Sequence, residues 1–244
     1  MHVFISGGAR GIGRKIVERF YCEGYNVSFI YSSDYNAERL ISEICGKVDS
    51  TSEDRIIAVK ADVSDSEQVS QAVEVAVRKF GTIDVLISNS GISKVGLATD
   101  FSFDDYHKVM DVNFGGLFNL CNCVIPMMVH NKCGSIIAIS SMWGQRGASC
   151  EALYAASKGA VDSYIKSLAQ ELGPSGIRVN AVSPGVIDTD MLNCFTEDDK
   201  AELAEETPLG RLGNPEEIAN VVYYLSGSEA SFITGQIIGV DGGY

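Results

Sequence analysis

Three residues in the second half of the chain have the types and spacing of a proton-transfer site. Ser141 ends an apolar run, and Tyr154 and Lys158 stand four residues apart where a helical pattern begins. This spacing places both side chains on one helix face, a turn apart. An ammonium close to a phenol favours the phenolate and lowers the pKa of the tyrosine, so that it can give or take a proton as a hydride moves. Ser141 can hydrogen-bond a carbonyl oxygen and hold developing alkoxide charge.

The alternative to this catalytic interpretation is an exposed helical pair with an unrelated serine upstream. Of the ten tyrosines, only Tyr154 has a lysine four residues on. We therefore expect a catalytic set, provided that a hydride carrier can bind elsewhere in the chain.

A glycine-rich turn near the start of the chain predicts where that carrier binds. An apolar run, His2 to Ser6, is followed by Gly7, Gly11 and Gly13, and helical spacing begins after them. Strand, glycine turn and helix in this order let the backbone approach a pyrophosphate at the helix N-terminus. The pattern favours a nucleotide site over a turn without function.

The residues after the second predicted strand favour NADP(H) over NAD(H). A carboxylate at this point would hold the ribose 2′-hydroxyl of NAD, whereas a 2′-phosphate needs a cation and hydroxyl donors. The strand ends in Tyr31, Ser32 and Ser33, and Arg10 lies inside the glycine turn. Asp34 follows one step later and is either a ribose ligand or the cap of the next helix.

Strand and helix patterns alternate along the chain. The strands are short, apolar and rich in Val and Ile, as buried parallel strands are. We expect one α/β domain over residues 1–244, a Rossmann-type doubly wound sheet of about seven parallel strands with helices on both faces. The expected strands are 2–6, 27–31, 55–60, 83–88, 135–140, 177–182 and 236–240. The expected helices follow the glycine turn and occupy 37–48, a segment capped by Ser64 to Glu67, a long segment from Ser102 to Val129, 153–172, and a last helix from Asn214 and Pro215 to about 225.

A polar, acidic segment at about 188–213, with a short helix inside it, predicts a substrate lid. Ligands of such sheets bind beyond the carboxyl ends of the strands, where the motifs fall.

Composition limits the partners. A formal net charge of −13 argues against nucleic acid and anionic membranes, which attract basic faces. We expect no targeting or membrane-spanning segment. The seven cysteines form no CxxC pair and predict reduced thiols in the cytoplasm, and we expect no metal site.

Together these motifs resemble those of the short-chain dehydrogenase/reductases over the whole chain, and most closely the bacterial 3-oxoacyl-[acyl-carrier-protein] reductase branch. The matching pieces are Ser6 to Gly13, Asp62-Val63, Ser88 to Gly91, Val112-Asn113, Ser141, Tyr154 to Lys158, Pro184-Gly185, Thr189, Thr234 to Gln236 and Asp241 to Gly243.

The resemblance implies roles. Asn113 would be the fourth catalytic residue, holding a water in a relay to Lys158, or simply a polar residue that kinks its helix. The cofactor contacts would be Gly7, Arg10, Gly11, Ile12, Gly13, Ser32, Asp62, Val63, Asn89, Gly91, Tyr154, Lys158, Pro184, Gly185, Ile187 and Thr189. The resemblance also implies a homotetramer.

Three features depart from that branch. The usual Asn-Asn-Ala-Gly motif of that branch is replaced here by Ser88-Asn89-Ser90-Gly91. That branch uses two basic residues at the site mouth to hold the acidic carrier. The corresponding residues here are Lys132, which is basic, and Ser175, which is not. Residues 142–151 resemble elongation factor P 5-aminopentanone reductases. In that case Glu151 would pair with a substrate amino group, although exposed glutamates are common at helix starts, and Trp143 would line the pocket or only pack.

These features predict NADPH-dependent reduction of a ketone, with a 3-oxoacyl-[acyl-carrier-protein] as the first candidate substrate. A protein-borne ketone on elongation factor P is the second, and a small alcohol, sugar or steroid the third. A non-catalytic nucleotide-binding regulator is disfavoured, because such proteins lose the tyrosine or lysine that this chain keeps.

Overall fold

A parallel sheet of seven strands forms the centre of the computed structural model, which describes residues 1–32, 37–46, 53–192 and 195–244. The strands are β1 (His2–Ser6), β2 (Asn26–Tyr31), β3 (Ile56–Lys60), β4 (Val85–Ser88), β5 (Gly134–Ile139), β6 (Ile177–Pro184) and β7 (Ile237–Val240). Their spatial order is β3-β2-β1-β4-β5-β6-β7, and every described pairing is parallel. The order reverses between β1 and β4, which creates the crevice where doubly wound sheets bind ligands. The predicted fold class is confirmed.

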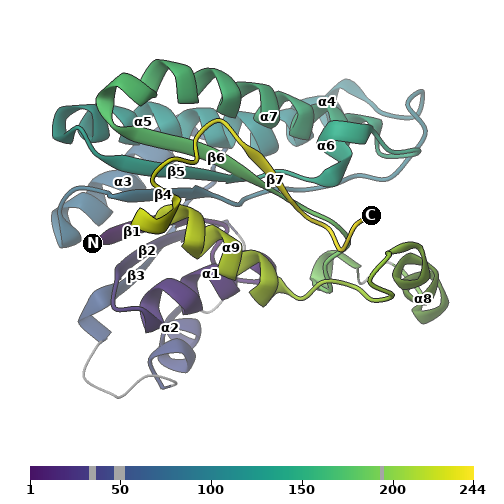
Figure 1. Cartoon of the computed structure of the whole chain (residues 1–244), viewed down its shortest axis with the longest axis horizontal. Coiled ribbons are helices and arrows are strands. Elements are labelled where there is room, and N and C mark those ends of the chain that lie inside the picture. The colour runs from purple at the N-terminus through teal and green to yellow at the C-terminus, as the bar shows by residue number, and fades with distance from the viewer. Residues whose placement is uncertain (33–36, 47–52, 193–194) are drawn as a thin grey trace.

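Helices cover both faces of the sheet (Figure 1). On one face lie α3 (Ser66–Phe80), α4 (Phe103–Met110), a π-helical turn (Asp111–Gly115), α5 (Gly116–Asn131) and α7 (Ala152–Leu172); on the other lie α1 (Gly11–Cys22), α2 (Ala37–Cys45) and α9 (Pro215–Ser226). The short α6 (Met142–Arg146) precedes α7, and α8 (Glu197–Glu206) projects from the side of the molecule.

Apolar residues of both sheet faces form the two cores. β1 and β4 are buried at every position. Phe4 and Ile136 face the α3–α5–α7 layer, whereas Ile5 and Ile137 face the α1–α9 layer. Because each fully buried side chain of this size contributes about 1.5–3 kcal/mol, the sheet is the rigid part from which the site is built.

Most predicted boundaries agree with the structure to within two residues. The capping box of Ser102 and the Asn214–Pro215 helix start are confirmed. The cap predicted at Ser64 is wrong: Asp65 is the N-cap of α3 and accepts hydrogen bonds from the amides of Glu67 and Gln68, while the Ser64 hydroxyl donates to Asp62. A carboxylate binds two helix amides better than a hydroxyl that has another partner. Residues 47–48 of the expected second helix lie outside the described residues.

The helical segment Phe103–Asn131 is long and apolar enough to cross a membrane by length and composition alone. Its residues Leu117, Leu120, Val124 and Met128 are instead buried in the core against α3, α7 and the sheet. The segment therefore serves here as a core helix.

Candidate active site

The glycine turn between β1 and α1 forms a cradle that side chains would fill. Gly7 and Gly11 have φ values of +66° and +53°, in the left-handed region that favours glycine. A Cβ on Gly13 would overlap the carbonyl oxygen of Gly7. Asn89, which follows β4, donates from Nδ2 to the carbonyls of Ser6 and Gly7, both at 3.1 Å. The turn is thus fixed from the neighbouring strand.

The N-terminus of α1 suits an anionic ligand. In the described chain no side chain caps this helix, and its first turn has no acidic residue. Its free amides and helix dipole therefore remain available to a pyrophosphate, and the residues fit a dinucleotide cofactor. Arg10, the N-cap residue, and Ser32, just after β2, are exposed. Ser33 and the alternative ribose ligand Asp34 lie outside the described residues.

The loop after β3 carries the predicted adenine contacts. Asp62 is exposed, and its Oδ1 accepts hydrogen bonds from the Ser64 amide at 2.9 Å and hydroxyl at 2.7 Å. Val63 is buried, and its carbonyl accepts a hydrogen bond from Asn119 of α5. The loop is therefore anchored while its backbone stays at the crevice.

Ser141, Tyr154 and Lys158 come together at the carboxyl end of β5. Ser141 is the N-cap of α6, and its Oγ accepts a hydrogen bond from the Trp143 amide at 3.3 Å. The Tyr154 hydroxyl interacts with Ser141. The ring centroid of Tyr154 lies 5.7 Å from Nζ of Lys158, which is buried and donates to the carbonyl of Ile139 at 2.8 Å. The predicted catalytic set is therefore a spatial cluster.

The electrostatics of Tyr154 differ from the sequence prediction. Burial raises its pKa to about 12; the interaction with Ser141 opposes this shift, and the charge of Glu151 adds to it. Lys158 makes no contribution to this shift, and burial lowers the pKa of the lysine itself to about 8, against the attraction of Asp162. The expectation of a tyrosine pKa lowered toward neutrality is therefore wrong for this structure: the phenol is protonated at neutral pH and is an acid rather than a base.

Asn113 lies in the π-helical turn between α4 and α5. It is buried, its Oδ1 accepts from the Ile92 amide at 2.8 Å, and its Nδ2 donates to the Ile92 carbonyl and to Oγ of Ser157, both at 2.9 Å. A Cβ on Gly91 would lie 3.3 Å from Lys158 Nζ and 3.5 Å from Asn113 Oδ1. The helix irregularity, of a kind often found at functional sites, thus places Asn113 beside Gly91 and Lys158.

The segment after β6 leads from the site into residues 188–213, the predicted lid. Pro184 ends β6, and a Cβ on Gly185 would overlap Asp241. Ile187 forms a parallel bridge with Gly213, which ties the two ends of the lid together. A Cβ on Gly11 would lie 3.6 Å from Thr189, so the lid begins beside the glycine turn. The short helix expected in the lid is α8.

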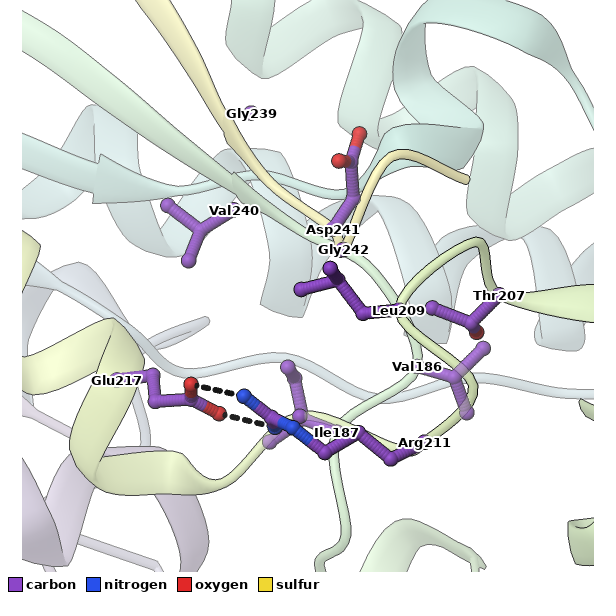
Figure 2. A pocket seen from close by; sticks show the side chains of 11 residues that line it. Val186, Ile187, Thr207, Leu209, Arg211, Glu217, Gly239, Val240, Asp241 and Gly242 are labelled. Atoms are coloured by element: carbon purple, nitrogen blue, oxygen red, sulfur yellow. Dashed lines mark hydrogen bonds and ion pairs between the residues drawn. The ribbon is translucent and has the colours of Figure 1, made fainter. Parts of the chain in front are cut away.

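A cavity of roughly 200 Å³ lies at the base of the lid (Figure 2). Val186, Ile187, Thr207 and Leu209 line it. The Arg211 guanidinium pairs with both carboxylate oxygens of Glu217, at 2.7 and 2.9 Å, along one side. None of the catalytic set lines this cavity, whereas Ile187, an expected cofactor contact, does, so the cavity is separate from the Ser141–Tyr154–Lys158 cluster.

The distinctive segment 142–151 connects Ser141 to the helix of Tyr154 and Lys158 and includes α6. The Trp143 ring packs edge-to-face on Tyr244, with centroids 5.7 Å apart. Glu151, which precedes α7, is partly buried and accepts a hydrogen bond from Ser93 at 3.1 Å. Burial raises the pKa of Glu151, against the hydrogen bond from Ser93. The expectation of a merely exposed helix-start glutamate is therefore wrong.

Lys132 and Ser175 do not lie at the site mouth of this chain. Lys132 precedes β5 and Ser175 precedes β6, so both lie where the strands begin, which we call the amino edge of the sheet. Ser141 and Pro184 lie where the strands end, which we call the carboxyl edge. In parallel strands, residues before and after a strand lie at opposite edges of the sheet. Lys132 and Ser175 are thus not at the site mouth of the same chain, where the resemblance places the residues that hold a carrier.

Sequence reasoning gave no role to three residues that support the site. The Ser6 hydroxyl accepts hydrogen bonds from the amides of Asn89 and Ser90, both at 3.0 Å. Ser157 holds Asn113, and Asp162 on α7 accepts a hydrogen bond from Ser140. One signal was available: Asp162 follows Lys158 by four residues on a helix face shared with Val161 and Ile165, both buried.

Among the described residues, no group of three or more His, Cys, Asp and Glu is arranged to hold a metal ion. The six described cysteines are free.

Comparison with known proteins identifies the family. A family model described as enoyl-(acyl carrier protein) reductase matches residues 7–244. The chain is 40% identical over 240 residues to an uncharacterized oxidoreductase, YmfI, of Bacillus subtilis, and the match covers 98% of this chain and 97% of the relative. It is 39% identical over 242 residues to the 3-oxoacyl-[acyl-carrier-protein] reductase FabG of Thermotoga maritima, with 98% and 95% covered.

Solved structures agree. A 3-oxoacyl-[acyl-carrier protein] reductase of Brucella melitensis superposes with a TM-score of 0.92 at 35% identity, covering 99% of this chain and 90% of that one. Levodione reductase gives 0.93 at 30% identity, with 99% and 96% covered. The glycine cradle, the Ser141–Tyr154–Lys158 cluster and these full-length similarities agree, and the chain belongs to the short-chain dehydrogenase/reductase family of nicotinamide-dependent oxidoreductases.

Proposed function

We propose that this protein reduces a ketone to a secondary alcohol with NADPH. The observation that carries this proposal is the cluster at the end of β5, in which a protonated phenol interacts with a serine and lies beside a buried lysine. When bound, the nicotinamide cofactor supplies hydride. Ser141 donates a hydrogen bond to the ketone oxygen, and Tyr154 delivers the proton to it.

Lys158 and Asn113 prepare the tyrosine for the next turnover. Lys158 carries positive charge next to the phenol and would also hold the ribose of a bound cofactor. The side chain of Asn113 is held by Ile92 and Ser157, which fixes the π-helical turn beside the lysine. We propose that a water bound at the backbone of this turn returns protons through Lys158 to Tyr154.

We propose NADPH as the preferred cofactor because Arg10 and Ser32 are exposed beside the glycine cradle. A cation and hydroxyls bind a 2′-phosphate, which the NAD ribose lacks. Arg10→Ala should raise the KM for NADPH by about tenfold and leave the KM for NADH unchanged. Equal effects on both cofactors would contradict this preference.

The first candidate substrate is a 3-oxoacyl thioester, since curated relatives at up to 39% identity bear the name 3-oxoacyl-[acyl-carrier-protein] reductase. Purified protein should oxidise NADPH when acetoacetyl thioester is added, on coenzyme A or on an acyl-carrier protein. Activity on the coenzyme A thioester with no gain from the carrier would agree with the absence of Lys132 and Ser175 from the site mouth of this chain.

A ketone that carries an amino group is the second candidate, and Glu151 is the observation in its favour. This carboxylate is partly buried, bonded to Ser93 and close enough to Tyr154 to raise the pKa of the phenol. It can thus bind an ammonium near the reacting ketone. Elongation factor P bearing a ketone on a modified lysine is the test substrate.

Glu151→Gln separates the two candidates. It should raise the KM for the amine-bearing ketone at least about tenfold, because the ammonium loses its partner, and should leave the thioester unaffected. Glu205→Gln, which removes an exposed lid carboxylate, is the matched control. If the protein turns over neither substrate, a small alcohol, sugar or steroid remains as the candidate substrate.

We further propose a cytoplasmic homotetramer. Phe118 and Val129 of α5 are 45% and 39% exposed, and Phe232, before β7, is fully exposed. Apolar side chains on a long helix and beside an edge strand favour association through these surfaces. Light scattering after size-exclusion chromatography should give about four times the 26.2 kDa chain mass; a monomer at all concentrations would contradict this.

A further inference from the structure

A buried carboxylate, Asp162, lies behind the catalytic cluster and has no assigned role. It is 5% exposed and stands on α7, one helical turn after Lys158. Its Oδ1 accepts a hydrogen bond from the Ser140 hydroxyl at 2.5 Å. In the part of the chain that the structure describes, its Oδ2 is buried without a hydrogen-bond partner. Burying a carboxylate with an unpaired oxygen costs free energy that an apolar residue would avoid.

The packing around Asp162 fixes it in place. A Cβ on Gly144 of α6 would lie 3.1 Å from Oδ2 of Asp162 and 3.0 Å from Cβ of Lys158. The two helices therefore touch at this glycine, so that Asp162 contacts the turn that leads from Ser141 into α6. Through Ser140, the same carboxylate holds the residue directly before Ser141.

The charges that face Asp162 come from its own helix. Burial raises the pKa of Asp162, and the hydrogen bond from Ser140 and the charges of Lys166 and Lys158 oppose this shift. The residues that pack against it from other elements, Ser140 after β5 and Gly144 of α6, are uncharged. Arg146, the ionisable residue of α6, acts on Tyr244 instead. Asp162 is in turn the group that opposes the effect of burial on Lys158.

We infer that Asp162 is a positioning residue of the active site: it orients Ser141 through Ser140 and provides the buried negative charge that keeps Lys158 protonated. This inference rests on the proposed catalytic roles of Ser141 and Lys158. It connects Ser141 and Lys158 to one carboxylate, which acts through these two residues and not on substrate or cofactor directly.

The pH dependence of turnover tests this inference, because a purely structural residue would not move it. In the wild type, activity should fall on the acid side as Asp162 is protonated and on the alkaline side as Lys158 loses its proton. Asp162→Asn keeps the size and an acceptor oxygen for Ser140 but removes the charge. The alkaline limb of kcat/KM should then move about one pH unit lower, because an ammonium without its counter-charge loses its proton more easily.

The Ser140→Ala variant tests the link from Asp162 through Ser140 to Ser141. The carboxylate loses its hydrogen-bond donor, so its pKa rises, and the acid limb should move to higher pH while the alkaline limb stays. Displacement of Ser141 should also lower kcat about tenfold with little change in KM. If Asp162→Asn fails to fold, these shifts still decide the question.

Glu171→Gln is the matched control, since it removes an exposed carboxylate from the same helix and should leave both limbs unchanged. The NADPH dissociation constant, measured against pH by fluorescence titration, is a second readout that needs no turnover; its alkaline limb should also move in Asp162→Asn. If the acid and alkaline limbs of the pH profile in a folded Asp162→Asn and in Ser140→Ala both match those of the wild type, the role of Asp162 is overturned. Absence of ketone reduction by the wild-type protein would overturn the proposed function, while the binding titration would still report on Asp162.

Discussion

The two edges of the sheet treat their polar groups in opposite ways. At the amino edge, polar side chains at strand starts are used for hydrogen bonds to backbone. Arg178 of β6 donates to the carbonyls of Leu225, Ser226 and Gly227 at the end of α9, at 2.6 to 3.1 Å. Arg55, before β3, donates to the carbonyl of Tyr21 in the last turn of α1 and to that of Tyr25 just before β2. These contacts satisfy helix ends that would otherwise keep unpaired carbonyls.

At the carboxyl edge, polar groups are buried but left partly unpaired. The α1 amides lack a side-chain cap among the described residues, Asp162 keeps a free oxygen, and burial shifts the pKa values of Tyr154 and Lys158. Unpaired groups cost stability, and they persist where a ligand or a proton can use them. The comparison indicates that substitutions at the carboxyl edge should change chemistry more than stability, and those at the amino edge the reverse.

The largest expected effect is at the carboxyl edge. Tyr154→Phe removes the proton donor but leaves the ring, so kcat should fall by about 10²–10⁴-fold, the usual contribution of a positioned acid. The melting temperature should stay within a few degrees of the wild type. Absorbance of NADPH measures turnover, and retention of full turnover by the variant would rule out the assigned proton donor.

Gly13→Ala tests the cofactor cradle. The added Cβ would overlap the Gly7 carbonyl and approach Nδ2 of Asn89, so the turn must open. We expect NADPH affinity to fall by at least about tenfold, since the amides no longer converge on the pyrophosphate. Gly24→Ala, in a turn where a Cβ would meet no atom within 4 Å, is the control for backbone strain alone, since its φ is +86°. Equal NADPH binding by both variants would contradict the assignment.

Arg178→Met tests the amino edge. It keeps most of the apolar stem but leaves the last carbonyls of α9 without their donors, which should lower the free energy of unfolding by about 2–3 kcal/mol. Urea denaturation measures this loss. Specific activity per folded molecule should be unchanged; a large loss of kcat in the folded variant would erase the distinction between the edges.

His2 should give the smallest effect, one that depends on pH. Its ring contacts the carbonyl of Gly81 and the hydroxyl of Ser28 at 3.1 and 2.9 Å, and burial lowers its pKa below 6.5. Because the folded state binds the proton less readily than the unfolded one, this contribution is complete above pH 6.5 and is lost as the pH falls below it. Urea unfolding of wild type and His2→Gln from about pH 8 to 5 should show the difference in the free energy of unfolding shrinking as the pH falls. A constant difference would show that His2 does not titrate on unfolding.

Local patterns were sufficient to predict the fold and the main site residues. Apolar strand runs, the glycine turn and the Tyr154–Lys158 spacing each depend on neighbours in sequence, and they predicted seven strands and the catalytic cluster. Properties that depend on three-dimensional surroundings were not accessible. The pKa of Tyr154 depends on how deeply α6 and α7 bury the phenol, and the cap of α3 depends on Ser64 having another partner.

Long-range contacts explain the other differences. Asn113 was expected from resemblance, but the π-helical turn that directs it depends on its bonds to Ile92 and Ser157. Lys132 was placed at the site mouth by counting along the chain, which does not state the edge of the sheet at which a residue lies.

The bridge between Ile187 and Gly213 has a consequence for how this protein can diversify. The lid leaves the body and returns to it at one point, so its ends stay closed whatever lies between them. Loop-closure entropy changes by only about 0.6 kcal/mol for each doubling of length. We therefore propose that the segment between these two residues is an exchangeable module, and we expect a replacement grafted there to alter substrate choice while the sheet and the Ser141–Tyr154–Lys158 cluster stay as they are.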